Sequence, residues 1–111
     1  MEKIWLKSYS EAVPHEIKLE NITLPEALSR SAKRFPENPA LYFQGKTVKY
    51  RELDDMVSRF ASALKALGVK PGDKVATLLP NLVQHVVGIY GSFRAGATVV
   101  LNNPLYTDRE L

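Results

Sequence analysis

Residues 40–47, ALYFQGKT, are the part of this chain that comes closest to a nucleotide-binding motif. They match the phosphate-loop pattern G-x-x-x-x-G-K-[ST] except at the first position, where Ala40 replaces glycine. A phosphate loop needs glycines so that successive backbone N–H groups can wrap around the phosphates. Here an apolar, aromatic, strand-like run precedes Gln44. Gly45 and Lys46 therefore indicate a hairpin turn, and we favour the hairpin over a phosphate loop.

Two histidines and a cluster of carboxylates are the other groups that could do chemistry. His15 and His85 lie far apart in the chain, and neither has a carboxylate at metal-ligand spacing. We predict that each is a satisfied or surface histidine and that they form no metal site. Glu52, Asp54 and Asp55 stand near the start of a predicted helix, where the helix dipole stabilises negative charge. We interpret them as capping charges rather than a catalytic pair.

A polar segment, Asn102, Asn103 and Pro104, directly follows an apolar run at 97–101. In an open α/β sheet, ligands bind just outside the carboxyl ends of the strands, which is where this segment falls. An ordinary strand-to-helix connection, with Pro104 holding Asn103 extended, explains it equally well. Both interpretations stay open, and the residues alone assign no catalytic, cofactor-binding or metal-binding side chain.

Composition narrows the class of protein. The 111 residues are 45% hydrophobic and 24% charged, as in soluble globular domains. The net charge of +3 comes from interspersed signs, so no basic stripe for nucleic acid is present. The absence of cysteine excludes disulfides and thiolate metal sites. With no signal peptide and no run of about 18 apolar residues, we expect a cytoplasmic location and no membrane span.

The pattern of apolar residues predicts an irregular arm followed by an α/β unit. Residues 1–22 lack periodicity and carry isolated apolar anchors: Ile4, Trp5, Tyr9, Ile17 and Leu19. A helix is predicted over 24–35, with Thr23 as N-cap and Glu26 as its capping-box partner. Its inward stripe is Leu24, Ala27, Leu28, Ala32 and Phe35.

Two further helices are predicted. The first starts at 50 or 51 and ends at Gly68, with Val69 completing a Schellman-type cap; its inward stripe is Leu53, Val57, Phe60, Leu64 and Leu67. The second starts at Asn81, with Gln84 as its capping-box partner, and is closed by Gly96; its inward residues are Val83, Val86, Val87, Tyr90 and Phe93.

Apolar runs at 75–79 and 97–101 flank this last helix and predict two parallel strands joined by a right-handed βαβ crossover. With the hairpin at 40–49 and three helices, the expected fold class is α/β. Parallel strands need both faces covered and both edges paired or protected, and this chain supplies few of those neighbours. Thr107 and Glu110 also match a capping box with one residue after it. We therefore expect 23–111 to be an incomplete domain of a longer protein.

Several motifs together resemble the adenylate-forming, AMP-binding enzymes over residues 24–111. The motifs are YREL at 50–53, LGVKPGDKVA at 67–76, LPN at 79–81, RAGA at 94–97 and NNPLY at 102–106. Within that superfamily, NPLYT at 103–107 followed by REL at 109–111 looks most like the long-chain fatty acid–CoA ligases. The resemblance implies a partial N-terminal subdomain of such a ligase.

The resemblance also implies a reaction and its cofactors. A fatty acid carboxylate attacks the α-phosphate of Mg-ATP, and the thiol of coenzyme A then displaces AMP to give the thioester. The family's reactive groups are a Ser/Thr/Gly-rich loop, a metal-binding glutamate, a ribose-binding aspartate and a lysine of a mobile C-terminal domain. None of these motifs occurs in the chain. We therefore expect this chain alone to be inactive and to bind ATP, Mg²⁺ and coenzyme A weakly at most.

Two alternatives differ in class from the ligase. The chain could be a non-catalytic module whose arm, with Ile4, Trp5 and Tyr9, packs on a second subunit. Some relatives of the resembled family are similar in using an N-terminal segment at a dimer interface. The other alternative is the disfavoured phosphate-loop nucleotide binder. For the parent ligase, peripheral membrane association is compatible with the lack of a spanning segment.

Overall fold

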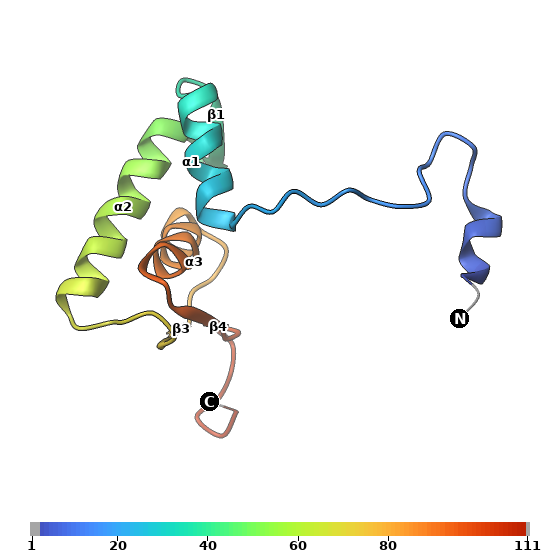
Figure 1. Ribbon diagram of the computed structural model, residues 1–111. Coiled ribbons are helices and arrows are strands. Elements are labelled where there is room, and N and C mark those ends of the chain that lie inside the picture. Colours follow the sequence, from blue (N-terminus) through green and yellow to red (C-terminus); the bar gives the residue numbers. More distant parts are fainter. Residues whose placement is uncertain (1–2, 111) are drawn as a thin grey trace.

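The computed structural model describes residues 3–110 and has the predicted α/β organisation (Figure 1). A short 3₁₀ helix, Ile4–Ser8, lies in the arm. The other elements, in chain order, are α1 (Leu24–Arg34), β1 (Pro39–Phe43), β2 (Lys46–Lys49), α2 (Tyr50–Ala66), β3 (Lys74–Thr77), α3 (Val83–Ala95) and β4 (Thr98–Leu101). Strands β1 and β2 form an antiparallel pair, and β3 and β4 a parallel pair. The predicted hairpin, βαβ unit and three helices are therefore confirmed.

Helix α1 starts with the predicted capping box. The backbone N–H of Thr23 donates to Glu26 Oε2 at 2.8 Å, and the N–H of Glu26 donates to Thr23 Oγ1 at 3.4 Å. The hydrogen bond from the Thr23 side chain, followed by the one from its backbone, holds the pKa of Glu26 below its ordinary value of 4.5. Leu28 and Ala32 of the predicted stripe are buried, whereas Leu24 and Phe35 at the two ends are about half exposed.

The hairpin turn consists of Gln44 and Gly45, which both have a positive φ, of 47° and 77°. A two-residue hairpin loop of the type that matches strand twist needs this backbone conformation at both positions. Lys46 then begins β2 and, after Lys49, the chain enters α2 directly. No helix starts at Lys46, so the segment has the context of a hairpin and not that of a phosphate loop.

Helix α2 ends in the predicted Schellman motif. The N–H of Gly68 donates to Lys65 O and that of Val69 to Leu64 O, both at 3.0 Å. Gly68 has φ 95°, which a residue with a Cβ rarely adopts. Along the helix Leu53, Val57 and Ala61 are buried, but Leu67 of the predicted stripe is 83% exposed because it lies at the C-cap, where the helix no longer faces its neighbours.

Helix α3 starts later than predicted. Its N-cap is Leu82, whose side chain makes no capping hydrogen bond, so the prediction that Asn81 and Gln84 form a capping box is wrong. Gly96 closes the helix with φ 89°, as predicted. Both parallel strands are shorter than predicted. Strand β3 covers Lys74–Thr77 where 75–79 was predicted, and β4 covers Thr98–Leu101 where 97–101 was predicted. Four residue pairs, from Lys74↔Thr98 to Thr77↔Leu101, form the ladder between them.

Small residues of α3 allow α2 to approach it closely. The buried residues of α3 are Gly88, Gly91, Ser92 and Ala95. A Cβ on Gly91 would lie 2.6 Å from Cδ1 of Phe60 and 3.2 Å from its Cβ. Part of the predicted inward stripe, Val86, Val87 and Tyr90, does pack against the core cluster of Leu28, Leu53 and Val57. The prediction missed the small residues because their burial depends on which helix crosses α3.

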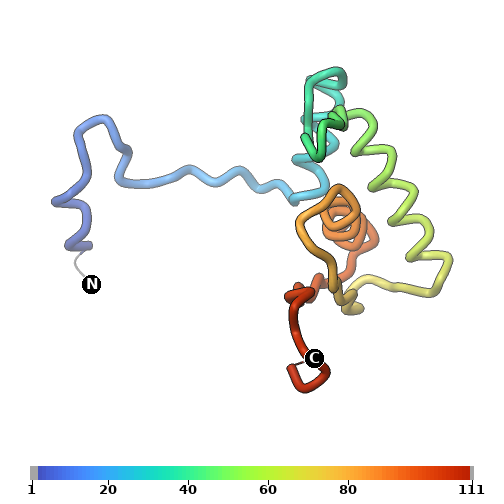
Figure 2. Tube along the Cα trace, turned by 180° about the vertical axis from the view of Figure 1, so that it is seen from behind, coloured from blue at the N-terminus to red at the C-terminus, as the bar shows by residue number. Residues whose placement is uncertain are grey.

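The arm before α1 projects away from the helices (Figures 1 and 2). Its predicted anchors stay exposed, from 43% for Tyr9 to 88% for Leu19. The radius of gyration is 17.9 Å, against about 13 Å for a compact domain of this length. Within residues 3–110, the arm therefore adds little to the core.

Alanine substitutions at Gly88 and Gly91 should separate helix propensity from packing. Each gains about 1 kcal/mol of helix propensity. At Gly88 the new Cβ meets only Thr77 Cγ2 at 3.9 Å, an ordinary contact, whereas at Gly91 it collides with Phe60. We expect the Gly91→Ala variant to have a free energy of unfolding about 1–3 kcal/mol below that of Gly88→Ala in urea titrations followed by circular dichroism. Equal stability of the two variants would contradict the close helix contact.

Candidate functional site

The carboxyl ends of β3 and β4 lie at one edge of their sheet, because the strands are parallel. A cavity of about 510 Å³ opens there between the segment 79–81, the start of α3 and residues 101–105. Its polar lining comes from Asn81, His85, Asn102 and Asn103. The polar segment 102–104 thus lies where an open α/β sheet binds ligands.

Both asparagines of the segment 102–104 are used to hold the chain. The backbone N–H of Asn102 donates to Thr77 O at 2.9 Å, and its Nδ2 donates to the same oxygen at 3.3 Å. Asn103 Oδ1 accepts from the N–H of Leu105 at 3.0 Å, a local turn that asparagine favours. The interpretation of this segment as a structural connection accounts for both side chains.

The two histidines occupy different parts of the molecule. His85 is partly buried on α3, with Nε2 3.5 Å from Thr77 Oγ1. His15 is exposed on the arm, where its ring meets Tyr9 edge-on at a centroid distance of 6.2 Å. Over residues 3–110, no group of three or more His, Cys, Asp or Glu side chains is arranged to hold a metal ion.

The predicted capping box at 107–110 is only half formed: the Glu110 carboxylate accepts from Thr107, but the backbone N–H of Glu110 donates to Thr107 O and not to the threonine side chain. Both the backbone N–H and Oγ1 of Thr107 donate to Glu110 Oε2 at 2.8 Å. The backbone hydrogen bond first, and the side-chain one second, hold the pKa of Glu110 below its ordinary value. Leu111, the last residue of the family motif, lies outside the described residues.

Two glycine-containing motif segments, 67–76 and 94–97, contact each other. The N–H of Gly72 donates to Gly96 O at 3.0 Å. A Cβ on Gly96 would lie 3.1 Å from Cα of Pro71, and the residue already needs a positive φ to close α3. These motif residues therefore position the start of β3 against the end of α3.

Arg94 joins three helices through a polar cluster that the sequence did not predict. Its Nη2 donates to Asp54 Oδ1 at 2.6 Å and to Ser29 Oγ at 2.7 Å, and its Nη1 donates to Ser58 Oγ at 2.7 Å. The Arg94 and Asp54 side chains are only 19% and 30% exposed. The guanidinium of one α3 residue thereby donates hydrogen bonds to side chains on both α1 and α2.

The three carboxylates interpreted as capping charges have separate roles. Glu52 is a capping residue, as predicted: its Oε2 accepts a hydrogen bond from the N–H of Lys49 at 2.9 Å, at the start of α2. For Asp54 the prediction is wrong, since its carboxylate pairs with Arg94 across the helix contact. Asp55 forms an exposed ion pair with Arg59, one turn along α2, at 2.6 Å. The spacing of Asp54 and Ser58 on one helix face was a signal for a polar partner, but it does not name one.

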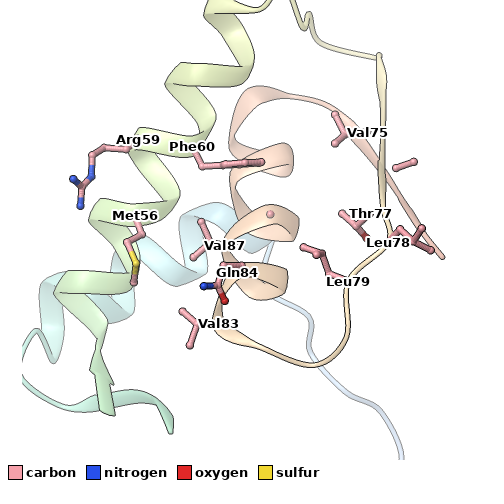
Figure 3. A pocket seen from close by; sticks show the side chains of 12 residues that line it. Met56, Arg59, Phe60, Val75, Thr77, Leu78, Leu79, Val83, Gln84 and Val87 are labelled. Atoms are coloured by element: carbon pink, nitrogen blue, oxygen red, sulfur yellow. The ribbon is translucent and has the colours of Figure 1, made fainter. Parts of the chain in front are cut away.

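An apolar groove of about 580 Å³ lies between α2, β3 and α3 (Figure 3). Met56 and Phe60 of α2, and Val83 and Val87 of α3, form its side walls, and the segment from Val75 to Leu79 forms the remaining wall. Sequence periodicity could not indicate this groove, because three separate segments create it.

The profile of the AMP-binding enzyme family matches residues 28–111, which is most of the chain. The chain belongs to the AMP-binding enzyme family. Within that family it is 42% identical over 110 residues to a long-chain-fatty-acid–CoA ligase of Bacillus subtilis. It is also 41% identical over 88 residues to a 3-[(3aS,4S,7aS)-7a-methyl-1,5-dioxo-octahydro-1H-inden-4-yl]propanoyl:CoA ligase of Rhodococcus jostii.

Coverage differs between the chain and these family members. The match spans 99% of this chain but 20% of the Bacillus subtilis protein, and 79% of this chain but 17% of the Rhodococcus jostii protein. The chain thus spans about one fifth of the length of such relatives.

Solved structures of the family share the fold. The N-terminal subdomain of Klebsiella oxytoca NpsA in complex with 3-hydroxyanthranilyl-AMSN superposes with a TM-score of 0.76 at 27% identity, covering 78% of this chain and 22% of that one. Unliganded o-succinylbenzoate coenzyme A synthetase of Bacillus subtilis superposes with a TM-score of 0.71 at 33% identity. The match covers 74% of this chain and 17% of the synthetase. The fold is therefore that of a part of the N-terminal subdomain of adenylate-forming enzymes.

Replacing Arg94 by methionine should destabilise the fold. The change leaves the Asp54 carboxylate partly buried without its cation, and we expect a loss of about 1.5–3 kcal/mol in urea unfolding. As a matched control, Arg59→Met removes an exposed ion pair and should cost about 0.5 kcal/mol or less. A double-mutant cycle with Asp54→Leu should give a coupling of about 0.5–3 kcal/mol. An Arg94 variant as stable as the Arg59 variant would contradict the role of the cluster.

Proposed function

We propose that this chain is the N-terminal portion of a long-chain fatty acid–CoA ligase. The observation that supports the proposal is 42% identity over almost the whole chain to a protein of that name, together with the match to the AMP-binding family. The proposed organisation is an arm at 1–22 followed by part of an AMP-binding domain at 23–111.

The proposed reaction has two steps. A fatty acid carboxylate attacks the α-phosphate of ATP with loss of pyrophosphate, and the thiol of coenzyme A then attacks the acyl carbon and displaces AMP. Catalysis requires two anions to be held in line while amides and cations stabilise the charge that builds on the phosphate. We propose that Mg²⁺ assists the first step and that fatty acid, ATP and coenzyme A bind through the rest of the ligase.

The residues of this chain are assigned a positioning role and no chemical step. Lys46, the one lysine in a phosphate-loop-like context, begins a strand and is followed by no helix whose N-terminus could receive a phosphate. The asparagines at the carboxyl edge hold backbone groups, and Arg94 is engaged by the helices. These four side chains are therefore assigned no contact with a triphosphate.

A cytoplasmic location belongs to the same proposal. Over residues 3–110, no helix is both long enough and apolar enough to cross a membrane. Attachment of the ligase to a membrane surface is a further proposal, for which the exposed apolar side chains of the arm are the available contact residues.

The purified 111-residue chain should release no pyrophosphate. In an assay with ATP, Mg²⁺, coenzyme A and a long-chain fatty acid, we expect a rate equal to that of buffer, because the chain lacks the family's reactive motifs. The Bacillus subtilis relative serves as the positive control. Robust turnover by the chain itself would refute the assignment of the chemistry to other residues.

A second candidate function is a dimerisation module. Ile17 and Leu19 are 80% and 88% exposed, and the arm that carries them extends away from the helices (Figure 2). Near its end the arm meets α1 through an exposed ion pair between Glu20 and Arg30. Exposed apolar side chains that lie close together can mark a protein–protein contact, and a second subunit would cover them in this candidate function.

Deleting residues 1–20 should lower the association state if the arm joins subunits. We expect the full chain to sediment as a dimer and the deletion variant as a monomer at the same concentration. Circular dichroism should show that α1 to α3 persist in the variant, since the arm adds little to their core. An unchanged sedimentation coefficient, after correction for mass, would count against this function.

A further inference from the structure

We draw no further inference here: the strongest candidate, the polar cavity at the carboxyl edge of β3 and β4 beside the start of α3, belongs to the candidate site already described, and among residues 3–110 no buried polar side chain without a hydrogen-bond partner points to a ligand there.

Discussion

The crossing of α2 over α3 is the contact on which the rest of the structure depends. Gly91 lets the ring of Phe60 lie directly on the α3 backbone, and the neighbouring buried positions of α3 are also small. At this distance a guanidinium on α3 can reach both other helices, and Arg94 does so through Asp54, Ser58 and Ser29. Steric fit and a partly buried polar cluster thus orient the same three helices.

This helix arrangement determines what happens at the sheet. Helix α3 contacts α2 on one side and both parallel strands on another, and its end is held to the start of β3 by the hydrogen bond between Gly72 and Gly96. Two segments that carry the family resemblance are therefore neighbours in space with a structural role. Within residues 3–110 the sheet has two strands, and β4 carries exposed apolar side chains such as Leu101.

Much of the fold could be predicted from the sequence, because many signals act over a few residues. Thr23 with Glu26, and Gly68 with Val69, make their hydrogen bonds within one helical turn. The wrong prediction of a capping box at Asn81 also came from a local pattern. The residue types of a capping box are present there, but α3 begins further along the chain, at Val83. The candidate site could be predicted only in part. The position of 102–104 at the carboxyl edge of the sheet follows from the direction of the predicted strands. The hydrogen bond of Asn102 to Thr77 depends on the register between β3 and β4, which the sequence does not give.

The sequence by itself determined the family, the order of elements, the hairpin turn and most helix ends, because motif spacing and short-range hydrogen bonds carry that information. Only the tertiary structure decided the partner of Asp54, the use of small residues on α3 and the groove beside β3. The Arg94 cluster joins Ser29 to a residue 65 positions away along the chain. Contacts of that range depend on how helices cross, and no local pattern of residue types specifies a crossing.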